Sequence, residues 1–393
     1  MMLVSCVYPY NPDLVTRDGR MVIEGAITVG STCEFKFSYV YGFNDPDDKA
    51  LPTVTGYVEG EDGRKFTGYH PLQEVPTGTY RRFYQYNIDM FDASPNVRYR
   101  VHFEDADGNV YESDWIKVCD KPVIDDLRYI LDHDRKELNV AISMHCPTET
   151  RFRWHYIETW EYHSILYATH YFNYQLMWDA NGKYAPLNAW LPFKGDDNTY
   201  YCWKTNPSPE VKVISTSDQN ENRFTDLEFH RVPSSDQKLS VFYNLRLYFE
   251  AIDENAYLYW KNIEENSDNQ GGIFSPVPSQ MHGNVYCVSN PDAEVIGYIN
   301  ASQVAIADVY YNNQVERFYD GTETSGALPD IIETEDPDDF MTLYSRGYRP
   351  YTHIPQVIGS EYGIFQWSWA TCVDCRLLGG SKNRPADWPN PHW

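Results

Sequence analysis

The feature that most constrains this fold is a strict alternation of apolar and polar residues early in the chain. The stretch Cys33–Tyr41 reads Cys-Glu-Phe-Lys-Phe-Ser-Tyr-Val-Tyr, and Met21–Val29 before it is rich in β-branched residues. A period of two places every second side chain on the same face of an extended backbone. Both stretches therefore predict half-buried β-strands, and we expect a mainly β protein.

Two Asp-Gly turns extend this β pattern over the first third of the chain. Asp62-Gly63 and Asp107-Gly108 each stand between two short apolar stretches, and Asp-Gly is favoured in hairpins because both central residues adopt positive φ. About seven short strands in about 100 residues are typical of an immunoglobulin-like β-sandwich. The strands expected are Met21–Val29, Cys33–Tyr41, Val54–Glu59, Lys65–Tyr69, Thr79–Tyr86, Tyr99–Glu104 and Val110–Ile116.

A second, larger β-sandwich-like domain is predicted after the junction Cys119-Asp120-Lys121-Pro122. It is interrupted by an aromatic loop at about 170–205 and by one α-helix at about 253–265, where Asp253 is a suitable N-cap. The end of the chain is expected to be a coil-rich tail held by disulfides. The domains are thus residues 1–20 as a signal remnant and tether, 21–119, and 120–393. Strands expected in the last of these are Leu127–Leu131, Leu138–Met144, Arg151–Tyr162, Val211–Ser215, Leu239–Phe249, Asn284–Val288 and Val295–Tyr311.

Length and charge limit the functional classes. A chain of 393 residues exceeds the size at which a single core stops growing, so two domains are expected. The net charge of −25, from 57 acidic and 32 basic residues, opposes nucleic-acid binding, which depends on Lys and Arg displacing counterions. No stretch approaches the apolar run of about 18 residues that spans a membrane.

The segment Leu3-Val4-Ser5-Cys6 has the pattern of a bacterial lipoprotein signal, an aliphatic residue and two small residues before a cysteine. In that pathway the cysteine becomes the first mature residue and carries lipid chains. Such a pattern also occurs by chance, and the basic start and long apolar run of an export signal are missing before it. Its position before an irregular stretch favours lipidation of Cys6, and the membrane would then be reached through a lipid anchor.

The cysteines other than Cys6 are candidates for disulfides in an oxidising compartment. Their number is odd, so at least one thiol stays free or pairs between chains. For Cys372-Val373-Asp374-Cys375 we favour a disulfide over a metal site, because a zinc site needs a second ligand pair at defined spacing. We expect neither a metal nor a cofactor. The candidates are Cys33, Cys119, Cys146, Cys202, Cys287, Cys372 and Cys375.

Aromatic residues make up 16% of the chain and are densest between Trp154 and Trp203. Exposed aromatic rings bind sugars and form protein hot spots, so the loop at about 170–205 is a candidate binding loop. Aromatic residues also fill β-sandwich cores, and this alternative stays open for the loop. The candidate ligand-binding residues are Trp160, Tyr171, Tyr174, Trp178, Trp190 and Tyr200.

No catalytic motif is present: the chain lacks a Gly-x-Ser-x-Gly elbow, a His-Glu-x-x-His pair and a phosphate-binding glycine loop. Glu158 and Glu161, close to Trp160, have the composition of a glycosidase cleft. That reaction needs two carboxylates about 5–10 Å apart across a sugar, a distance that sequence does not supply. We therefore assign no catalytic residues and expect a protein that is not an enzyme.

Three segments resemble a family of Bacteroidetes outer-membrane lipoproteins catalogued as domain of unknown function 4249. They are the start of the chain, with Cys6 and Met21–Thr28; Ser275–Val285 continuing into Asn290–Tyr298; and Cys372–Arg376 with the Gly- and Trp-containing end. Trp154 and the helical segment Tyr257–Trp260 are also similar to the family.

The resemblance implies a lipid-anchored protein of the outer membrane that faces the cell exterior. Members look like non-enzymatic accessories or ligand-capture subunits of TonB-dependent transporters, which serve nutrient uptake. Of the functional positions only Cys6 carries over, whereas Gly283 and Gly297 suit tight backbone positions. The alternatives are a glycan-binding protein or glycoside-active enzyme, and an adhesin or structural envelope protein. A glycan or a peptide is a possible ligand.

Overall fold

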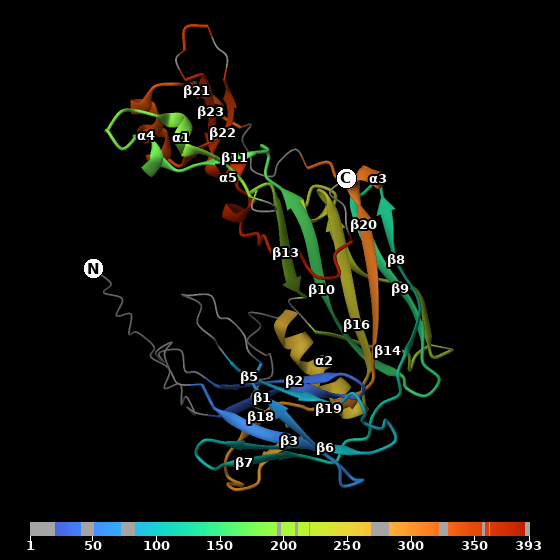
Figure 1. Cartoon of the computed structure of the whole chain (residues 1–393). Coiled ribbons are helices and arrows are strands. Elements are labelled where there is room, and N and C mark those ends of the chain that lie inside the picture. Colours follow the sequence, from blue (N-terminus) through green and yellow to red (C-terminus); the bar gives the residue numbers. More distant parts are fainter. Residues whose placement is uncertain are drawn as a thin grey trace, which may run out of the picture.

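The computed structural model describes residues 20–40, 51–71, 83–194, 198–208, 211–219, 221–268, 283–321, 329–355, 358–360 and 362–389. Cys6 and the predicted tether lie outside these residues, as do parts of the predicted strands Cys33–Tyr41 and Thr79–Tyr86. The fold is mainly β, as predicted. Figure 1 shows three parts: an N-terminal sandwich at the bottom, a second sandwich with long strands above it, and a small head at the top.

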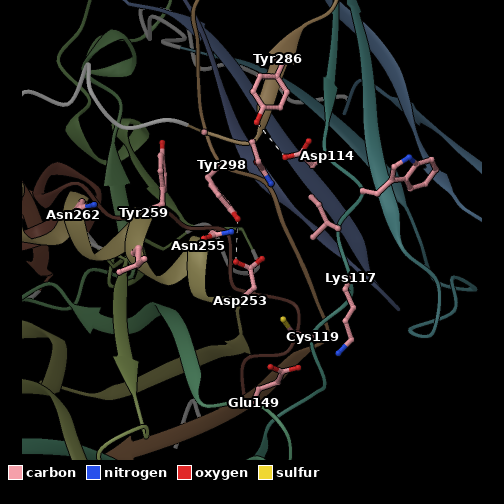
Figure 2. A pocket seen from close by; sticks show the side chains of 15 residues that line it. Asp114, Lys117, Cys119, Glu149, Asp253, Asn255, Tyr259, Asn262, Tyr286 and Tyr298 are labelled. Carbon is pink, nitrogen blue, oxygen red and sulfur yellow. Dashed lines mark hydrogen bonds between the residues drawn. The ribbon is translucent and has the colours of Figure 1, made fainter.

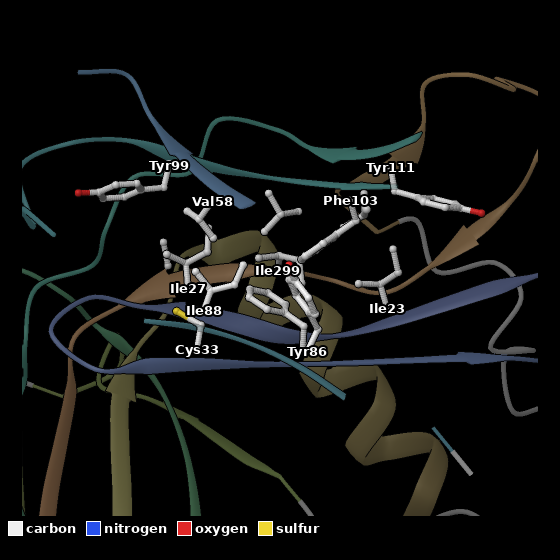
Figure 3. Packing of buried hydrophobic residues seen from close by; sticks show 14 of the residues in the cluster. Ile23, Ile27, Cys33, Val58, Tyr86, Ile88, Tyr99, Phe103, Tyr111 and Ile299 are labelled. Carbon is white, nitrogen blue, oxygen red and sulfur yellow. The ribbon is translucent and has the colours of Figure 1, made fainter. Parts of the chain in front are cut away.

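The N-terminal sandwich is built from strands that pair in the order β17-β7-β6-β3-β4-β5-β2-β1-β18, with β19 also paired to β1. Its core lies between two layers (Figure 3), where Phe103 packs edge-on against Phe35 and Phe37 at 5.0 and 4.9 Å. The strands are β1 (Met21–Thr28), β2 (Thr32–Tyr39), β3 (Val54–Gly60), β4 (Lys65–Tyr69), β5 (Tyr84–Asp89), β6 (Tyr99–Asp105), β7 (Val110–Ser113), β17 (Val285–Cys287), β18 (Val295–Ile296) and β19 (Asn300–Ser302).

The last three of these strands differ from the predicted division at residue 119. Residues 285–302 leave the second sandwich and return to the first, where β18 and β19 run parallel to β1 and β17 pairs antiparallel with β7. Ile299 and Val285 then enter the N-terminal core. The exchange pairs the outer sides of β1 and β7, where backbone groups would otherwise be left unpaired.

The second sandwich combines a sheet of β13-β10-β16-β20, with β14 also paired to β10, and a sheet of β15-β9-β8. Buried apolar residues of β9, β10 and β16 fill the space between them, and Phe152 stacks on Phe249 at 5.4 Å. The strands are β8 (Val123–Asp132), β9 (Glu137–His145), β10 (Arg151–His163), β13 (Tyr201–Pro207), β14 (Lys212–Ser215), β15 (Arg223–Pro233), β16 (Phe242–Ala251) and β20 (Val304–Asn312).

The predicted helix is present as α2 (Glu254–Asp268). Asp253 caps it, because its carboxylate accepts a hydrogen bond of 2.8 Å from the Ala256 backbone N–H. Ala256 and Tyr259 face inward at helical spacing, with Trp260 half-buried beside them. The helix lies between the two sandwiches (Figure 1). No helix in the described part of the chain is long and apolar enough to cross a membrane.

The head joins two segments that are far apart in sequence, residues 170–192 and 331–373. Met177 and Ala189 from the first segment share a buried core with Phe340, Phe365 and Trp367 from the second. The predicted aromatic loop is therefore half of a folded unit, and the C-terminal region holds more regular structure than expected. The head contains β11 (His170–Phe172), α1 (Pro186–Ala189), β12 (Trp190–Pro192), β21 (Ile332–Thr334), α4 (Pro337–Ser345), β22 (Tyr348–Ile354), β23 (Ile364–Trp369) and α5 (Ala370–Val373).

The C-terminal tail runs back onto the second sandwich and is held there by the disulfide Cys202–Cys375. Trp203 exchanges backbone hydrogen bonds of 2.8 Å with Ser381, and Trp388 is buried against Phe242. This agrees with the predicted disulfide-stapled tail. Several disulfides were expected, but among the described residues the structure contains one, Cys202–Cys375. The described cysteines with free, buried thiols are Cys33, Cys119, Cys146, Cys287 and Cys372.

Candidate functional site

The predicted ligand-binding aromatic residues divide between the head and the second sandwich. Tyr171, Tyr174 and Trp178 are 42%, 38% and 47% exposed in the head. Trp190 packs against the head core, with its ring 5.6 Å from that of Phe365. The aromatic residues of this segment therefore serve both predicted purposes: some rings fill a core, and others face solvent and are available for binding.

Trp160 is not available to a ligand in this structure. It is only 5% exposed, belongs to the core of the second sandwich, and lies 5.5 Å below the Lys238 ammonium. It follows the alternation of β10, which points it inward. Tyr200 is half-buried where the head meets the second sandwich, with its ring edge-on to the exposed Tyr167 at 5.0 Å.

The head exposes several large apolar side chains. Isolated exposed apolar residues need no explanation, but a concentration of them marks an interaction surface. The large apolar side chains that the described part of the head exposes are Tyr171, Tyr174, Leu176, Trp178, Leu187, Ile331, Met341, Ile354, Ile358 and Trp369.

Glu158 and Glu161 do not form a glycosidase pair. They are three residues apart on β10, so they point to opposite faces of the sheet. Glu161 is fully buried and accepts hydrogen bonds from Trp388 Nε1 at 3.0 Å and His163 Nε2 at 2.9 Å. No sugar fits between two carboxylates arranged in this way.

Glu158 is the centre of a buried polar network. Its carboxylate accepts hydrogen bonds from Lys238 Nζ at 2.8 Å, His230 Nε2 at 3.0 Å and the Tyr243 hydroxyl at 2.9 Å. Burial alone would raise the pKa of Glu158, but the bonds from His230 and Lys238 outweigh it and lower the pKa to about 2. The carboxylate is thus fixed as an anion with all its partners in place, which suits a structural role.

A cleft with a volume of about 730 Å³ lies between the N-terminal sandwich and α2 (Figure 2). Sequence reasoning missed it, because its walls come from five separate stretches of the chain. Only Cys119 among the predicted site residues lines it, and burial raises the pKa of that thiol strongly. The other polar and aromatic side chains that line it are Asp114, Trp115, Lys117, Glu149, Asp253, Asn255, Tyr259, Asn262, Asn284, Tyr286 and Tyr298.

Hydrogen bonds within the cleft fix its aromatic wall. The Tyr298 hydroxyl donates to Asp253 at 3.3 Å, and the Tyr298 ring lies 5.3 Å from that of Tyr259. Burial raises the pKa of Tyr259 to about 12. Across the cleft the half-exposed Tyr286 donates to Asp114 at 3.4 Å.

A buried polar cluster around Glu250 joins the two sandwiches beside this cleft. Glu250 on β16 accepts hydrogen bonds from Arg153 Nε at 2.7 Å and from Asn300 Nδ2 on β19 at 3.1 Å. Burial would raise the pKa of Glu250, but the Arg153 guanidinium and the Ser302 hydroxyl lower it. Because β19 belongs to the N-terminal sandwich, the walls of the cleft are held at a fixed separation.

No group of three or more potential metal ligands occurs among the residues that the structure describes. The fold and these surfaces define a mainly β protein of several sheets with a buried polar junction. By its sequence the chain belongs to the family described as a domain of unknown function, DUF4249, whose model matches residues 7–306. That match ends before the second half of the head and before Cys372–Arg376, which were part of the resemblance.

Two solved structures are distantly similar to this chain. A crystal structure of CBD12 from CALX1.2 is 8% identical, with a TM-score of 0.15 and coverage of 74% of this chain and 100% of that chain. The BSP domain of a biofilm-associated protein is 8% identical, with a TM-score of 0.16 and coverage of 90% and 77%. TM-scores of this size carry no argument about fold or function. A search among curated proteins found no match.

Proposed function

We propose that this protein is a non-enzymatic, lipid-anchored accessory of the outer membrane that docks on a TonB-dependent transporter through its head. The observation that carries the proposal is the set of exposed rings of Tyr171, Tyr174 and Trp178 in the head. The head lies at the opposite end of the molecule from the N-terminal sandwich, with the long strands of the second sandwich between them (Figure 1).

Exposed aromatic side chains are the residues that most often anchor a protein interface. A lipid on Cys6 would confine the protein to the membrane surface, and such a tether raises the effective concentration at a neighbouring partner to about millimolar. Stable anchoring requires more than one lipid chain, so the cysteine is proposed to be fully acylated. The buried, fully hydrogen-bonded Glu158 and Glu161 favour binding over hydrolysis.

The test is extraction of the tagged, full-length protein from its native membrane in mild detergent, followed by identification of what co-purifies. We expect a TonB-dependent transporter in stoichiometric amount, and acylated Cys6 in the mass spectrum. The double variant Tyr174→Ala/Trp178→Ala should lower recovery of the transporter at least tenfold, because each hot-spot ring contributes about 2 kcal/mol or more.

Phe91→Ala is the matched control, because Phe91 is 66% exposed but belongs to the N-terminal sandwich. It should leave recovery unchanged. Thermal unfolding of each variant checks that the fold is intact. Purification of the protein without a transporter, or equal recovery with both variants, would contradict docking through the head. Release of an unacylated protein into the soluble fraction would contradict the anchor.

A further inference from the structure

We propose that the cleft between the N-terminal sandwich and α2 binds a short, neutral oligosaccharide. This inference is independent of docking through the head, because the cleft and the head lie in different parts of the molecule (Figure 1). At about 730 Å³ the cleft falls within the range of about 300–1,000 Å³ typical of small-molecule sites.

The cleft offers one exposed aromatic ring at its rim, above an inner wall of buried aromatic side chains. Tyr259 and Tyr298 form a buried pair at its inner wall, and Tyr286 stands at the rim with 51% of its surface exposed. An aromatic face is electron-rich and attracts the weakly positive C–H groups that line one face of a sugar ring. A tyrosine also keeps a hydroxyl at its edge for hydrogen bonding. Figure 2 shows Tyr259, Tyr286 and Tyr298 around the same space.

The polar side chains of the cleft match hydroxyl groups better than they match an ion. Carboxylates of Asp114 and Glu149 accept hydrogen bonds, the Lys117 ammonium donates, and the amides of Asn255 and Asn262 do both. A sugar hydroxyl donates and accepts at once, so it uses all three kinds of group. Asp114, Lys117, Asn255 and Asn262 are exposed in the unliganded cleft, so they remain hydrated until a ligand arrives.

Other ligand classes fit this lining less well. An anion would meet carboxylates in a protein of net charge −25, and an apolar ligand would desolvate the polar groups without compensation. A basic peptide would be attracted by Asp114 and Glu149 but repelled by Lys117. A neutral polyhydroxylated molecule carries none of these costs.

The cleft is preformed, which lowers the cost of binding. Its two sides belong to different sandwiches, and Glu250 fixes them through Arg153 on one side and Asn300 on the other. On the side of the N-terminal sandwich, the Asn284 side chain holds its wall in place, since it donates to the Ile299 carbonyl at 2.7 Å and accepts from the Ile299 N–H at 2.8 Å. A ligand therefore meets walls that are already in position.

The experiment is isothermal titration of the full-length protein with maltohexaose, cellohexaose, laminarihexaose and xylohexaose, and with hexalysine as the basic-peptide probe. We expect at least one saccharide to bind. Tyr286→Ala and the double variant Asn255→Ala/Asn262→Ala should each weaken that binding at least tenfold. All three substituted residues are exposed, so the variants are expected to fold.

Trp178→Ala in the head is the control, since Trp178 is 47% exposed and Tyr286 is 51% exposed. Trp178→Ala should lower recovery of the transporter but bind the saccharide as the wild type does. Tyr286→Ala should weaken saccharide binding but leave recovery of the transporter unchanged. Failure of one proposal can therefore be distinguished from failure of the other. The carbohydrate proposal is overturned if no saccharide binds at 5 mM (about the limit of titration for weak ligands). It is also overturned if hexalysine binds instead, or if the cleft variants bind as well as the wild type.

Discussion

The side-chain carboxylate of Glu250 on β16 lies 3.1 Å from the side-chain amide nitrogen of Asn300 on β19, and this hydrogen bond joins the two sandwiches. Ser302 donates to the same carboxylate from the same strand. Arg153 supplies the countercharge, with only 10% of its side chain exposed. Since all these groups are buried, the junction is a single polar network, and its members depend on one another.

Replacing Arg153 by Met should lower the free energy of unfolding by about 3–5 kcal/mol, because it leaves Glu250 as a buried charge without a counterion. Chemical denaturation measures the loss. The control is Arg135→Met, which removes an exposed pair with Asp132 at 3.8 Å and should change stability by less than about 1 kcal/mol. Equal losses of unfolding free energy for the two substitutions would contradict a stabilising role of the buried junction.

Gly297 should tolerate no side chain. Its φ is +145°, and a Cβ there would lie 2.0 Å from the Ile23 carbonyl oxygen of β1. Gly297→Ala should therefore cost at least about 4 kcal/mol or prevent folding, as read from thermal unfolding and soluble yield. Gly108→Ala is the control, because Gly108 has φ of +81° but open space around it, and should cost about 1–2 kcal/mol. A mild Gly297 variant would contradict the close contact of this segment with β1.

Loss of the Cys202–Cys375 disulfide should destabilise the protein, because the bond connects residues separated by 173 positions. The entropy of so long a loop corresponds to about 5 kcal/mol in the chain-entropy account. Cys202→Ser/Cys375→Ser should lower the denaturation midpoint and release the tail to proteases. Cys372→Ala, at a free thiol nearby, should leave the tail protected. A peptide map of the non-reduced protein that lacks the 202–375 link would refute the pairing.

Acid should weaken the second sandwich through Glu158. The pKa of this carboxyl falls from an ordinary 4.5 to about 2 in the folded protein. A lowered pKa means that the ionised group stabilises the fold above pH 4.5, and that this contribution is lost as the pH falls toward 2. It amounts to about 3 kcal/mol. In denaturation series from pH 7 to pH 2, wild type and Glu158→Gln should converge at the acidic end; parallel curves would exclude this role.

Several predictions made from residues alone agree with the structure. The alternation of Cys33–Tyr39 is present in β2. Phe35 and Phe37 enter the core, and the side chains of the even-numbered residues face away from it. Asp253 caps α2, and Gly283 and Gly297 lie at tight backbone positions, where a Cβ on Gly283 would be 1.8 Å from the Gly297 carbonyl oxygen. In each case the signal is carried by a few adjacent residues, so it can be read locally.

The candidate site was less predictable for the same reason. Trp160 and Tyr171 are both aromatic residues in a dense aromatic region, yet one is buried and the other exposed. Trp160 is buried because β10 directs it into the core of the second sandwich, whereas Tyr171 lies on the surface of the head, which forms only when residues 331–373 pack against the loop at about 170–205. The cleft at α2 carries no sequence signal, because Lys117, Glu149 and Tyr286 approach only after the chain has folded.

Residue pattern alone was enough to predict a mainly β protein, the start of many strands and of the capped helix, and the two glycines at tight backbone positions. Side-chain period and backbone conformation are local properties, so they can be predicted from adjacent residues without knowing which strand is the partner. Three features became known from the folded chain alone: residues 285–302 complete the N-terminal sandwich, Cys202 bonds to Cys375, and Glu158 is surrounded by three donors. Those features depend on pairing between distant segments, where burial and hydrogen bonding are satisfied for the whole chain at once.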